Sequence, residues 1–402
     1  MRTVVAGIPT RNEAGTIAQV TSAIDHGLQQ AFSDHRCIIV NADNASTDAT
    51  GATFLATPTT AEKRFVSTGS RGTGKGSNLF AIFDLARDAE AGTVVVIDGD
   101  MRSVEPWWIN HLAEAVDHVE PALAIPTYRR RRFEGNVTNH LASPLIAATF
   151  GRVLRQPIAG AMAFNAGFLQ RVSAWPRPES SQLYGVDIHL TAHALRERLR
   201  LTEVPLSRAA HNAGLIPKMF FMQQQVLDSL FHVMLQHDRP TELDTGHPVE
   251  AIVFEPGGVQ PDSPAVAPLV GRAARYLEQH QADVLRLFPT LANAPECPWG
   301  PWLPTQTWGQ LLGEAVAGIA GGELLAVRDH LVALYLSRLM TFWAETSHLS
   351  DAGVATRLDH QIELTARAVH AQAVEFDIAA PPELSPGPWG DAHQEWLSQP
   401  AG

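Results

Sequence analysis

The chain has 402 residues, a length that suits two domains better than one small core. Apolar residues make up 45% and charged residues 18%, which are ordinary values for a soluble globular protein. The formal net charge of −12 argues against general binding to nucleic acid or to anionic membrane surfaces.

The N-terminal residues enter a strand pattern directly, without the apolar segment of a secretory signal. No run of about 20 apolar residues follows anywhere in the chain, so no membrane-spanning helix is predicted. The two cysteines, Cys37 and Cys297, lie far apart and lack zinc-type spacing, which argues against a disulfide framework. We therefore expect a cytoplasmic protein.

Residues 3–126 alternate between strand and helix patterns. β-branched apolar runs predict strands, and apolar residues at helical spacing predict the helices between them. The predicted strands are 3–8, 37–42, 65–67, 93–98 and 123–126, and the predicted helices are 14–30, 46–55, 77–88 and 106–119. Such alternation predicts an α/β fold with a mostly parallel sheet and helices on both faces.

The second half of the chain has a different character. Residues 237–266 are rich in Pro, Gly and acidic residues and are interpreted as a linker. Helical patterns cover residues 218–236, 270–287, 308–319, 323–345 and 352–376, and a proline-rich tail follows. We predict an α/β domain over 1–217, an all-helical C-terminal domain over 218–379 and an irregular tail over 380–402.

Asp98-Gly99-Asp100 follows the apolar run that ends at Ile97. This run predicts a buried strand, and open α/β sheets bind ligands at the carboxyl ends of their strands. Two adjacent carboxylates there favour a hard divalent cation, which commonly keeps phosphate oxygens among its ligands. The alternative is a simple Asp-Gly turn.

The segment from Gly69 to Gly76 nearly spells a phosphate-binding P-loop, with Lys75 as its lysine. Gly76 stands where a Ser or Thr hydroxyl would bind magnesium, and the segment follows the third strand instead of the first. A P-loop-like nucleotide hydrolase therefore remains an alternative. In a purely structural interpretation, the glycines allow close backbone approach and Lys75 is solvated.

Two polar segments follow the first two predicted strands: residues 9–13, Pro-Thr-Arg-Asn-Glu, and residues 43–48, Asp-Asn-Ala-Ser-Thr-Asp. Each alone is typical of a strand-to-helix turn with a helix cap. Together they would place polar groups on adjacent strand ends, beside Lys75 and Asp98. Such a crevice can hold a base and a ribose.

The succession of these motifs resembles nucleotide-sugar glycosyltransferases of the GT-A fold, which have a Rossmann-like, mostly parallel sheet. Further motifs are similar to the retaining enzymes that make glucosyl-3-phosphoglycerate, glucosylglycerate or mannosylglycerate. They are Gly135-Asn136-Val137-Thr138, Ser143-Pro144-Leu145, Gln156-Pro157-Ile158-Ala159-Gly160, Tyr184-Gly185-Val186-Asp187, Ala210-His211-Asn212 and Leu334-Tyr335-Leu336-Ser337-Arg338.

This resemblance implies roles for residues at each motif. The residues implied to contact the nucleotide sugar are Pro9, Arg11, Glu13, Asn44, Lys75 and Asp98. Asp100 and His211 would ligate Mg²⁺ or Mn²⁺, and Asp187 would face the donor sugar. The residues implied to bind the acceptor acid are Gly135, Asn136 and Thr138, where a loop runs into a helix start.

Two positions depart from the family pattern. Asn136 stands where relatives that use phosphoglycerate carry an Arg, unless the run Arg129–Arg132 substitutes for it. Ala161 stands where the family has a Glu near the acceptor. Both departures concern the acceptor and leave the metal site untouched.

The resemblance implies a metal-dependent, retaining hexosyltransferase. Its donor would be UDP-glucose, GDP-glucose or GDP-mannose, and its acceptor D-glycerate or 3-phosphoglycerate, which yields a compatible solute or its phosphate. We expect a homodimer that binds neither nucleic acid nor membrane. The alternatives are the P-loop-like hydrolase and a non-catalytic nucleotide-binding protein on a transferase fold.

Overall fold

The computed structural model describes residues 2–69, 74–210, 219–244, 249–255, 266–376 and Pro388. The chain forms two compact units. Unit 1 comprises residues 1–129 and 156–214 with the last four residues, and unit 2 comprises residues 130–155 and 215–398. The predicted boundary at residue 217 stays a prediction. His211 falls outside the described residues.

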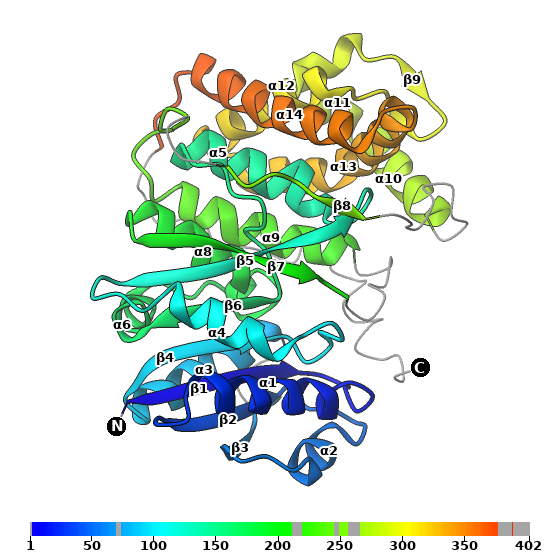
Figure 1. Ribbon diagram of the computed structural model, residues 1–402. Helices are drawn as coiled ribbons and strands as arrows, with labels where there is room; N and C mark the ends of the chain where they lie inside the picture. Colours follow the sequence, from blue (N-terminus) through cyan, green and yellow to red (C-terminus); the bar gives the residue numbers. More distant parts are fainter. Residues whose placement is uncertain are drawn as a thin grey trace. The chain divides into compact units, whose positions relative to one another are not determined.

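Unit 1 contains a mixed, mostly parallel sheet with the strand order β3-β2-β1-β4-β6-β5-β7 (Figure 1). Every neighbouring pair is parallel except the two made by β6, which is antiparallel to β4 and to β5. The predicted fold class, a GT-A-like sheet followed by a helical region, is confirmed. The strands are β1 Thr3–Thr10, β2 Arg36–Asp43, β3 Glu62–Ser67, β4 Ala91–Ile97, β5 Ala122–Arg131, β6 Ala161–Asn165 and β7 Arg200–Arg208.

Helices cover both faces of this sheet. Ala6 and Ile8 of β1 belong to one apolar cluster with α1 and α4. Gly7 points to the opposite face, where a Cβ atom would lie 2.6 Å from Ile82 of α3. The helices of unit 1 are α1 Ile17–Ala31, α2 Thr50–Ala56, α3 Lys75–Asp88, α4 Pro106–Glu114, α6 Ala166–Ala174, α7 Glu179–Gln182 and α8 Val186–Arg196.

The predicted start of the second helix at residue 46 is wrong. The helix α2 begins at Thr50, because the preceding polar side chains bind backbone groups in a turn. The Asp43 side chain accepts from the backbone N–H of Ser46 at 2.9 Å, and that of Asp48 accepts from the backbone N–H of Thr50 at 2.9 Å. The fourth helix ends at Glu114, five residues before its predicted end.

Unit 2 is largely helical, as predicted for the C-terminal region. Two of its helices, α12 and α14, approach closely because α12 carries glycines on the contact face: Cβ atoms at Gly309 and Gly313 would lie 2.9 and 2.8 Å from Cβ atoms of α14. The main helices are α5 Ser143–Phe150, α9 Met219–Met234, α10 Ala267–Gln279, α11 Gln281–Leu287, α12 Thr305–Ala320, α13 Leu324–Thr346 and α14 Asp351–Ala371.

Short elements complete unit 2. A π-helical turn, η2, spans Thr138–Ala142 directly before α5, and a 3₁₀ turn, η4, spans Pro289–Asn293. The strands are β8 Phe254–Glu255, β9 Glu296–Cys297 and β10 Gly300–Pro301. No helix in the described part of the chain combines the length and apolarity needed to span a bilayer.

Candidate functional site

The turn Asp98-Gly99-Asp100 leaves the carboxyl end of β4, as the sequence predicts. The backbone N–H of Gly99 donates to the carbonyl of Pro9 at 3.2 Å. A Cβ atom at Gly99 would lie 2.6 Å from Cγ2 of Thr10, so only glycine lets the turn pack this closely on β1. The turn therefore brings two carboxylates to the edge where β1 also ends.

Lys75 connects two carboxylates that are far apart in the sequence. Its Nζ atom lies 2.9 Å from Asp98 and 2.9 Å from Asp187 Oδ2. The three side chains are 14%, 20% and 6% exposed, respectively, so the ion pairs are shielded from water. The alternative of a solvated Lys75 is wrong, because the ammonium neutralises part of a buried acidic cluster.

The electrostatics of this cluster follow from its charges. Burial disfavours the Lys75 ammonium, but Asp187 and Asp98 outweigh it and raise the pKa of Lys75 above its ordinary value. Burial, together with the nearby carboxylates of Asp187 and Asp100, raises the pKa of Asp98 to about 6 against the opposing charge of Lys75. One ammonium therefore does not balance the acidic groups.

The raised pKa of Glu13 has the same cause, an excess of negative charge at a partly buried site. Burial and the carboxylate of Asp100 raise the pKa of Glu13 to about 7, with further contributions from Asp98 and Asp48 and an opposing hydrogen bond from Thr16. A divalent cation would relieve this repulsion, and carboxylates are the hard oxygen ligands that Mg²⁺ and Mn²⁺ accept. The carboxyl groups of this site therefore fit a divalent cation, and Asp100 is the carboxylate that the sequence predicts as its ligand.

The second predicted metal ligand, His211, directly follows the last described residue of its segment, Ala210. Its neighbour Ala210 accepts a hydrogen bond from the backbone N–H of Arg102 at 2.9 Å and donates to Ser103 at 2.9 Å. The chain thus returns to the segment just after Asp100. Among the described residues, no group of three or more His, Cys, Asp or Glu side chains is arranged to hold a metal.

The side chain of Asn44 forms hydrogen bonds with Arg11, with the segment before α3 and with Thr68. Its side-chain oxygen accepts from Arg11 at 3.3 Å and from the backbone N–H of Gly74 at 3.0 Å, and its amide nitrogen donates to Thr68 at 3.1 Å. Asn44 is buried, so these bonds fix its orientation. The structure therefore brings Arg11 and the start of α3 to one side chain.

The two polar turns after β1 and β2 are locked to each other. Asn12 and Ala45 adopt positive φ values of 58° and 52°, and the Asn12 side chain accepts from the backbone N–H of Thr47 at 2.8 Å. Pro9 lies buried in β1 opposite Ala42 of β2. The predicted adjacency of these strand ends is thus observed.

The glycine-rich segment does not have the arrangement of a P-loop in its described part. The backbone N–H of Gly76 donates to the carbonyl of Leu183 at 2.9 Å, and that of Gly74 donates to Asn44. A P-loop needs such N–H groups for phosphate oxygens. A Cβ atom at Gly76 would clash with the backbone of Ser181 and Gln182, so the glycines serve close backbone approach.

Asp187 lies in the first turn of α8, whose N-cap is Gly185. Its Oδ2 atom binds Lys75, while its buried Oδ1 atom has no hydrogen-bond partner among the described residues. A buried carboxylate oxygen costs free energy unless it accepts a hydrogen bond. Asp187 therefore has an acceptor position available for a ligand hydroxyl.

Tyr184 belongs to the same site, although no role is predicted for it from the sequence. Burial raises the pKa of its phenol, and the charges that act on it are those of Arg11, Lys75, Asp98 and Asp100. Its position directly before Gly185, in the Tyr-Gly-Val-Asp motif that ends at Asp187, was the available signal. Tyr184 is half-buried beside the acidic cluster.

The predicted acceptor residues lie in unit 2. Gly135 has a φ of +70°, and the guanidinium of Arg130 occupies the space where a Cβ atom would stand. The Asn136 side chain donates to the carbonyl of Phe133 at 2.8 Å, and Thr138 is the buried first residue of η2. Arg130 therefore brings a guanidinium to a loop that lacks one at position 136.

The second departure from the family pattern lies inside the core of unit 1. Ala161 is the first residue of β6, pairs with Ile97 and is fully buried in an apolar cluster. Its neighbour Gly160 accepts a hydrogen bond from the backbone N–H of Asp98 at 2.9 Å. Position 161 therefore offers no carboxylate to this edge of the sheet.

Residues 6–174 match the sequence model of the family described as Glycosyl transferase family 2. The chain contains a glycosyl transferase family 2 domain. This matched range includes most of β1, the Asp98-Gly99-Asp100 turn and Lys75. None of the curated proteins matches the chain at a significant level.

The solved structures to which this chain is similar include mycobacterial proteins. Glucosyl-3-phosphoglycerate synthase from Mycobacterium tuberculosis, in complex with Mn²⁺, UDP and phosphoglyceric acid, is 25% identical, with 61% of this chain and 81% of that chain covered and a TM-score of 0.48. The same enzyme in complex with Mn²⁺ and UDP-glucose is 25% identical, with 61% of this chain and 81% of that chain covered and a TM-score of 0.46. A structure described as a mycobacterial protein is 25% identical, with 61% of this chain and 77% of that chain covered and a TM-score of 0.49.

Proposed function

We propose that this protein is a metal-dependent, retaining glycosyltransferase that moves glucose or mannose from a UDP or GDP sugar to D-glycerate or 3-phosphoglycerate. The observation that carries the proposal is the buried Lys75 ammonium, 2.9 Å from both Asp98 and Asp187, within a glycosyl transferase family 2 domain. The acidic excess around this lysine supports a divalent cation, whose charge would in turn hold a diphosphate.

The nucleotide sugar would lie along the edge formed by β1, β2 and β4. Arg11 and Asn44 would contact the nucleotide, together with Pro9 and Glu13. Asp98 would bind the ribose or the sugar. The free Oδ1 position of Asp187 supports a hydrogen bond from a hydroxyl of the donor sugar. Lys75 would hold both carboxylates in place while the ligand binds.

Asp100 and His211 would hold Mg²⁺ or Mn²⁺. When bound, the metal neutralises charge on the leaving diphosphate, which is the main electrostatic task of the reaction. The raised pKa values of Glu13 and Asp98 support this assignment, because burial and neighbouring carboxylates raise both, and Lys75 offsets only part of this effect at Asp98. Lys75 and Arg11 supply the positive charge of the chain itself.

No carboxylate is assigned as a covalent nucleophile. Asp187 Oδ2 is engaged with Lys75, and Ala161 offers no side-chain acid. We therefore favour attack from the front face: the acceptor hydroxyl forms the new bond to the anomeric carbon on the side from which the diphosphate leaves. The departing phosphate oxygen takes the hydroxyl proton, and the configuration is retained.

The test is a matrix of UDP-glucose, GDP-glucose and GDP-mannose against D-glycerate and 3-phosphoglycerate, with Mg²⁺ or Mn²⁺. Released nucleoside diphosphate and the anomeric configuration of the product are measured. Transfer with retention that is lost in Asp100→Asn is expected. Metal-dependent nucleotide binding without transfer in any combination would instead indicate a non-catalytic binding protein, and hydrolysis of ATP would indicate a hydrolase.

A further inference from the structure

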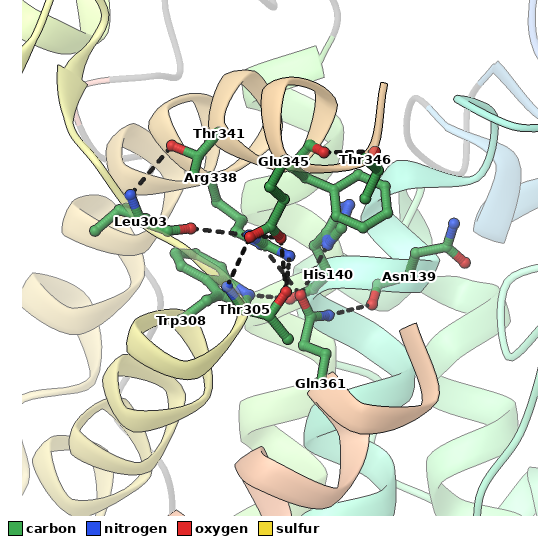
Figure 2. A network of polar contacts seen from close by, with 11 residues as sticks. Asn139, His140, Leu303, Thr305, Trp308, Arg338, Thr341, Glu345, Thr346 and Gln361 are labelled. Atoms are coloured by element: carbon green, nitrogen blue, oxygen red, sulfur yellow. Dashed lines mark hydrogen bonds and ion pairs between the residues drawn. The ribbon is translucent and has the colours of Figure 1, made fainter. Parts of the chain in front are cut away.

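A buried polar network in unit 2 joins α12, α13 and α14 to the segment that carries the proposed acceptor residues (Figure 2). Arg338 of α13 is fully buried at its centre. Its guanidinium donates to Leu303 O and to Glu345 at 2.8 Å each, and to Thr305 Oγ1 at 3.1 Å. Every named partner is an acceptor, so the charge of Arg338 is satisfied inside the unit.

Arg338 also sets the orientation of Gln361 on α14. The Nε atom of Arg338 donates to Gln361 Oε1 at 3.1 Å, and Nδ1 of His140 lies 3.1 Å from the same oxygen. Because a guanidinium only donates, this end of the Gln361 amide must be its oxygen. The amide nitrogen then points to the carbonyl of Asn139, to which it donates at 2.8 Å.

A second side chain donates a hydrogen bond to the next backbone carbonyl of η2. The indole N–H of Trp308, on α12, donates to the carbonyl of His140 at 2.7 Å. Two consecutive carbonyls of η2 thus receive donors from two different helices, as Figure 2 shows. Both side chains are fully buried, so water does not replace these donors.

Pro144 explains why η2 needs these donors. The Ser143 N–H donates to Thr138 O, five residues back, which is the wide register of a π turn. In that register the carbonyl of Asn139 would bind the N–H of residue 144, and in the α register the carbonyl of His140 would bind it. Pro144 has no N–H, so neither carbonyl can bind residue 144, and Gln361 and Trp308 supply donors to them instead.

The network reaches the acceptor loop through one residue. The backbone N–H of Asn139 donates to the carbonyl of Gly135 at 2.8 Å, and its side chain donates to the carbonyl of Glu134 at 3.3 Å. Asn139 therefore links the loop before it to the carbonyl that Gln361 binds. A change in the η2 register would move Gly135, Asn136 and Thr138 together.

We propose that Gln361, oriented by Arg338, is a positioning residue for acceptor binding. Together with Trp308 it holds the π turn at residues 138–142 and thereby fixes the loop that binds the acid group of the acceptor. This inference rests on the proposed function. If Gln361 acts in this way, the helical unit contributes to the affinity for the acceptor through the conformation of η2.

The test compares three variants of the full-length protein. Gln361→Met keeps the length of the side chain and removes its donor and its acceptor. Trp308→Phe keeps an aromatic ring and removes one donor. The control is Arg328→Met, because Arg328 is also fully buried on α13 and paired with Asp228 at 3.1 Å, but belongs to a separate ion-pair cluster with Asp329.

Initial rates are measured against D-glycerate and 3-phosphoglycerate at a saturating donor concentration, and donor affinity is measured by calorimetry. Gln361→Met should raise the acceptor KM about tenfold, and Trp308→Phe severalfold, since each leaves a buried carbonyl unpaired. In both variants kcat and donor affinity should stay within about twofold of wild type. Arg328→Met should leave the acceptor KM unchanged.

The outcomes separate the inference from the proposed function. An active wild type whose acceptor KM is unchanged in Trp308→Phe and Gln361→Met overturns the inference alone. An equal rise of KM in Arg328→Met also overturns it, because general destabilisation would then explain the effect. A wild type that transfers hexose to neither acid overturns the proposed function, and the inference with it. If Gln361→Met does not fold, Trp308→Phe decides.

Discussion

Replacing Lys75 with Met should destabilise unit 1 in a pH-dependent way. The substitution removes the ammonium that lies 2.9 Å from both Asp98 and Asp187 and leaves two carboxylates without a counter-ion. Loss of one partner of a buried ion pair costs roughly 3–5 kcal/mol. Because the Asp98 side chain keeps 20% exposure, we expect the lower end of this range.

The expected shift can be measured as a melting temperature. A cost of about 3 kcal/mol corresponds to a decrease of about 6–12 °C in a unit of this size at pH 8. The deficit should shrink as the pH falls. The pKa of Asp98 is already raised to about 6, and without Lys75 it rises further, so the folded variant binds a proton that the unfolded chain releases. Its stability therefore increases from pH 8 to pH 5 relative to wild type.

Lys63→Met is the matched control. The Lys63 ammonium donates to backbone carbonyls, including those of Phe54 at 3.0 Å and Leu55 at 2.7 Å, so its removal leaves no carboxylate unpaired. Its deficit should be the same at pH 5 and pH 8. Equal deficits for Lys75→Met at the two pH values, or a change of less than about 2 °C at pH 8, would refute the buried ion-pair account.

Three further outcomes follow from the same geometry. Gly76→Ala should lower the melting temperature and abolish donor binding, because the new Cβ atom would lie 2.6 Å from the Gln182 carbonyl carbon. The control is Gly15→Ala, whose Cβ atom would have no atom within 4 Å, and it should change neither the melting temperature nor donor binding. Glu13→Gln should be more stable than wild type at pH 8 and equal to it at pH 5, because the wild-type carboxyl, with a pKa of about 7, loses stability as the pH rises through that value. Burial and the positive charge of Arg338 hold the pKa of His140 well below its ordinary value, so unit 2 should lose stability as the pH falls below about 6.5. In thermal melts, the melting temperature of His140→Asn should depend less on pH in this range than that of the wild type.

The sequence predicted the parts of the fold that local patterns determine. The β-branched run before Asp98 predicted β4, and the paired polar turns predicted that β1 and β2 end side by side. The antiparallel strand β6 was not predicted, because its five residues carry no alternation that distinguishes them from a helix segment. The same limit applies to η2, whose wide turn depends on donors from α12 and α14.

The sequence names individual residues for the candidate site, and their roles stay predictions, but it does not predict how they pair. Lys75 and Asp187 are 112 positions apart, and no local pattern predicts that they form an ion pair. The sequence therefore allowed both a P-loop and a solvated lysine. The backbone of residues 181–183 determines the outcome, because it lies against Gly74 and Gly76 and occupies the N–H of Gly76.

The most direct test of the proposed site is a calorimetric titration of the protein with UDP and with GDP, each with and without Mn²⁺. The wild type should bind one of the two diphosphates only when Mn²⁺ is present. Asp100→Asn should lose this binding, while Asp84→Asn, a change on the exposed side of α3, should keep it. Metal-independent binding, or unchanged binding in Asp100→Asn, would contradict the assignment of a metal–diphosphate site to the Asp98-Gly99-Asp100 turn.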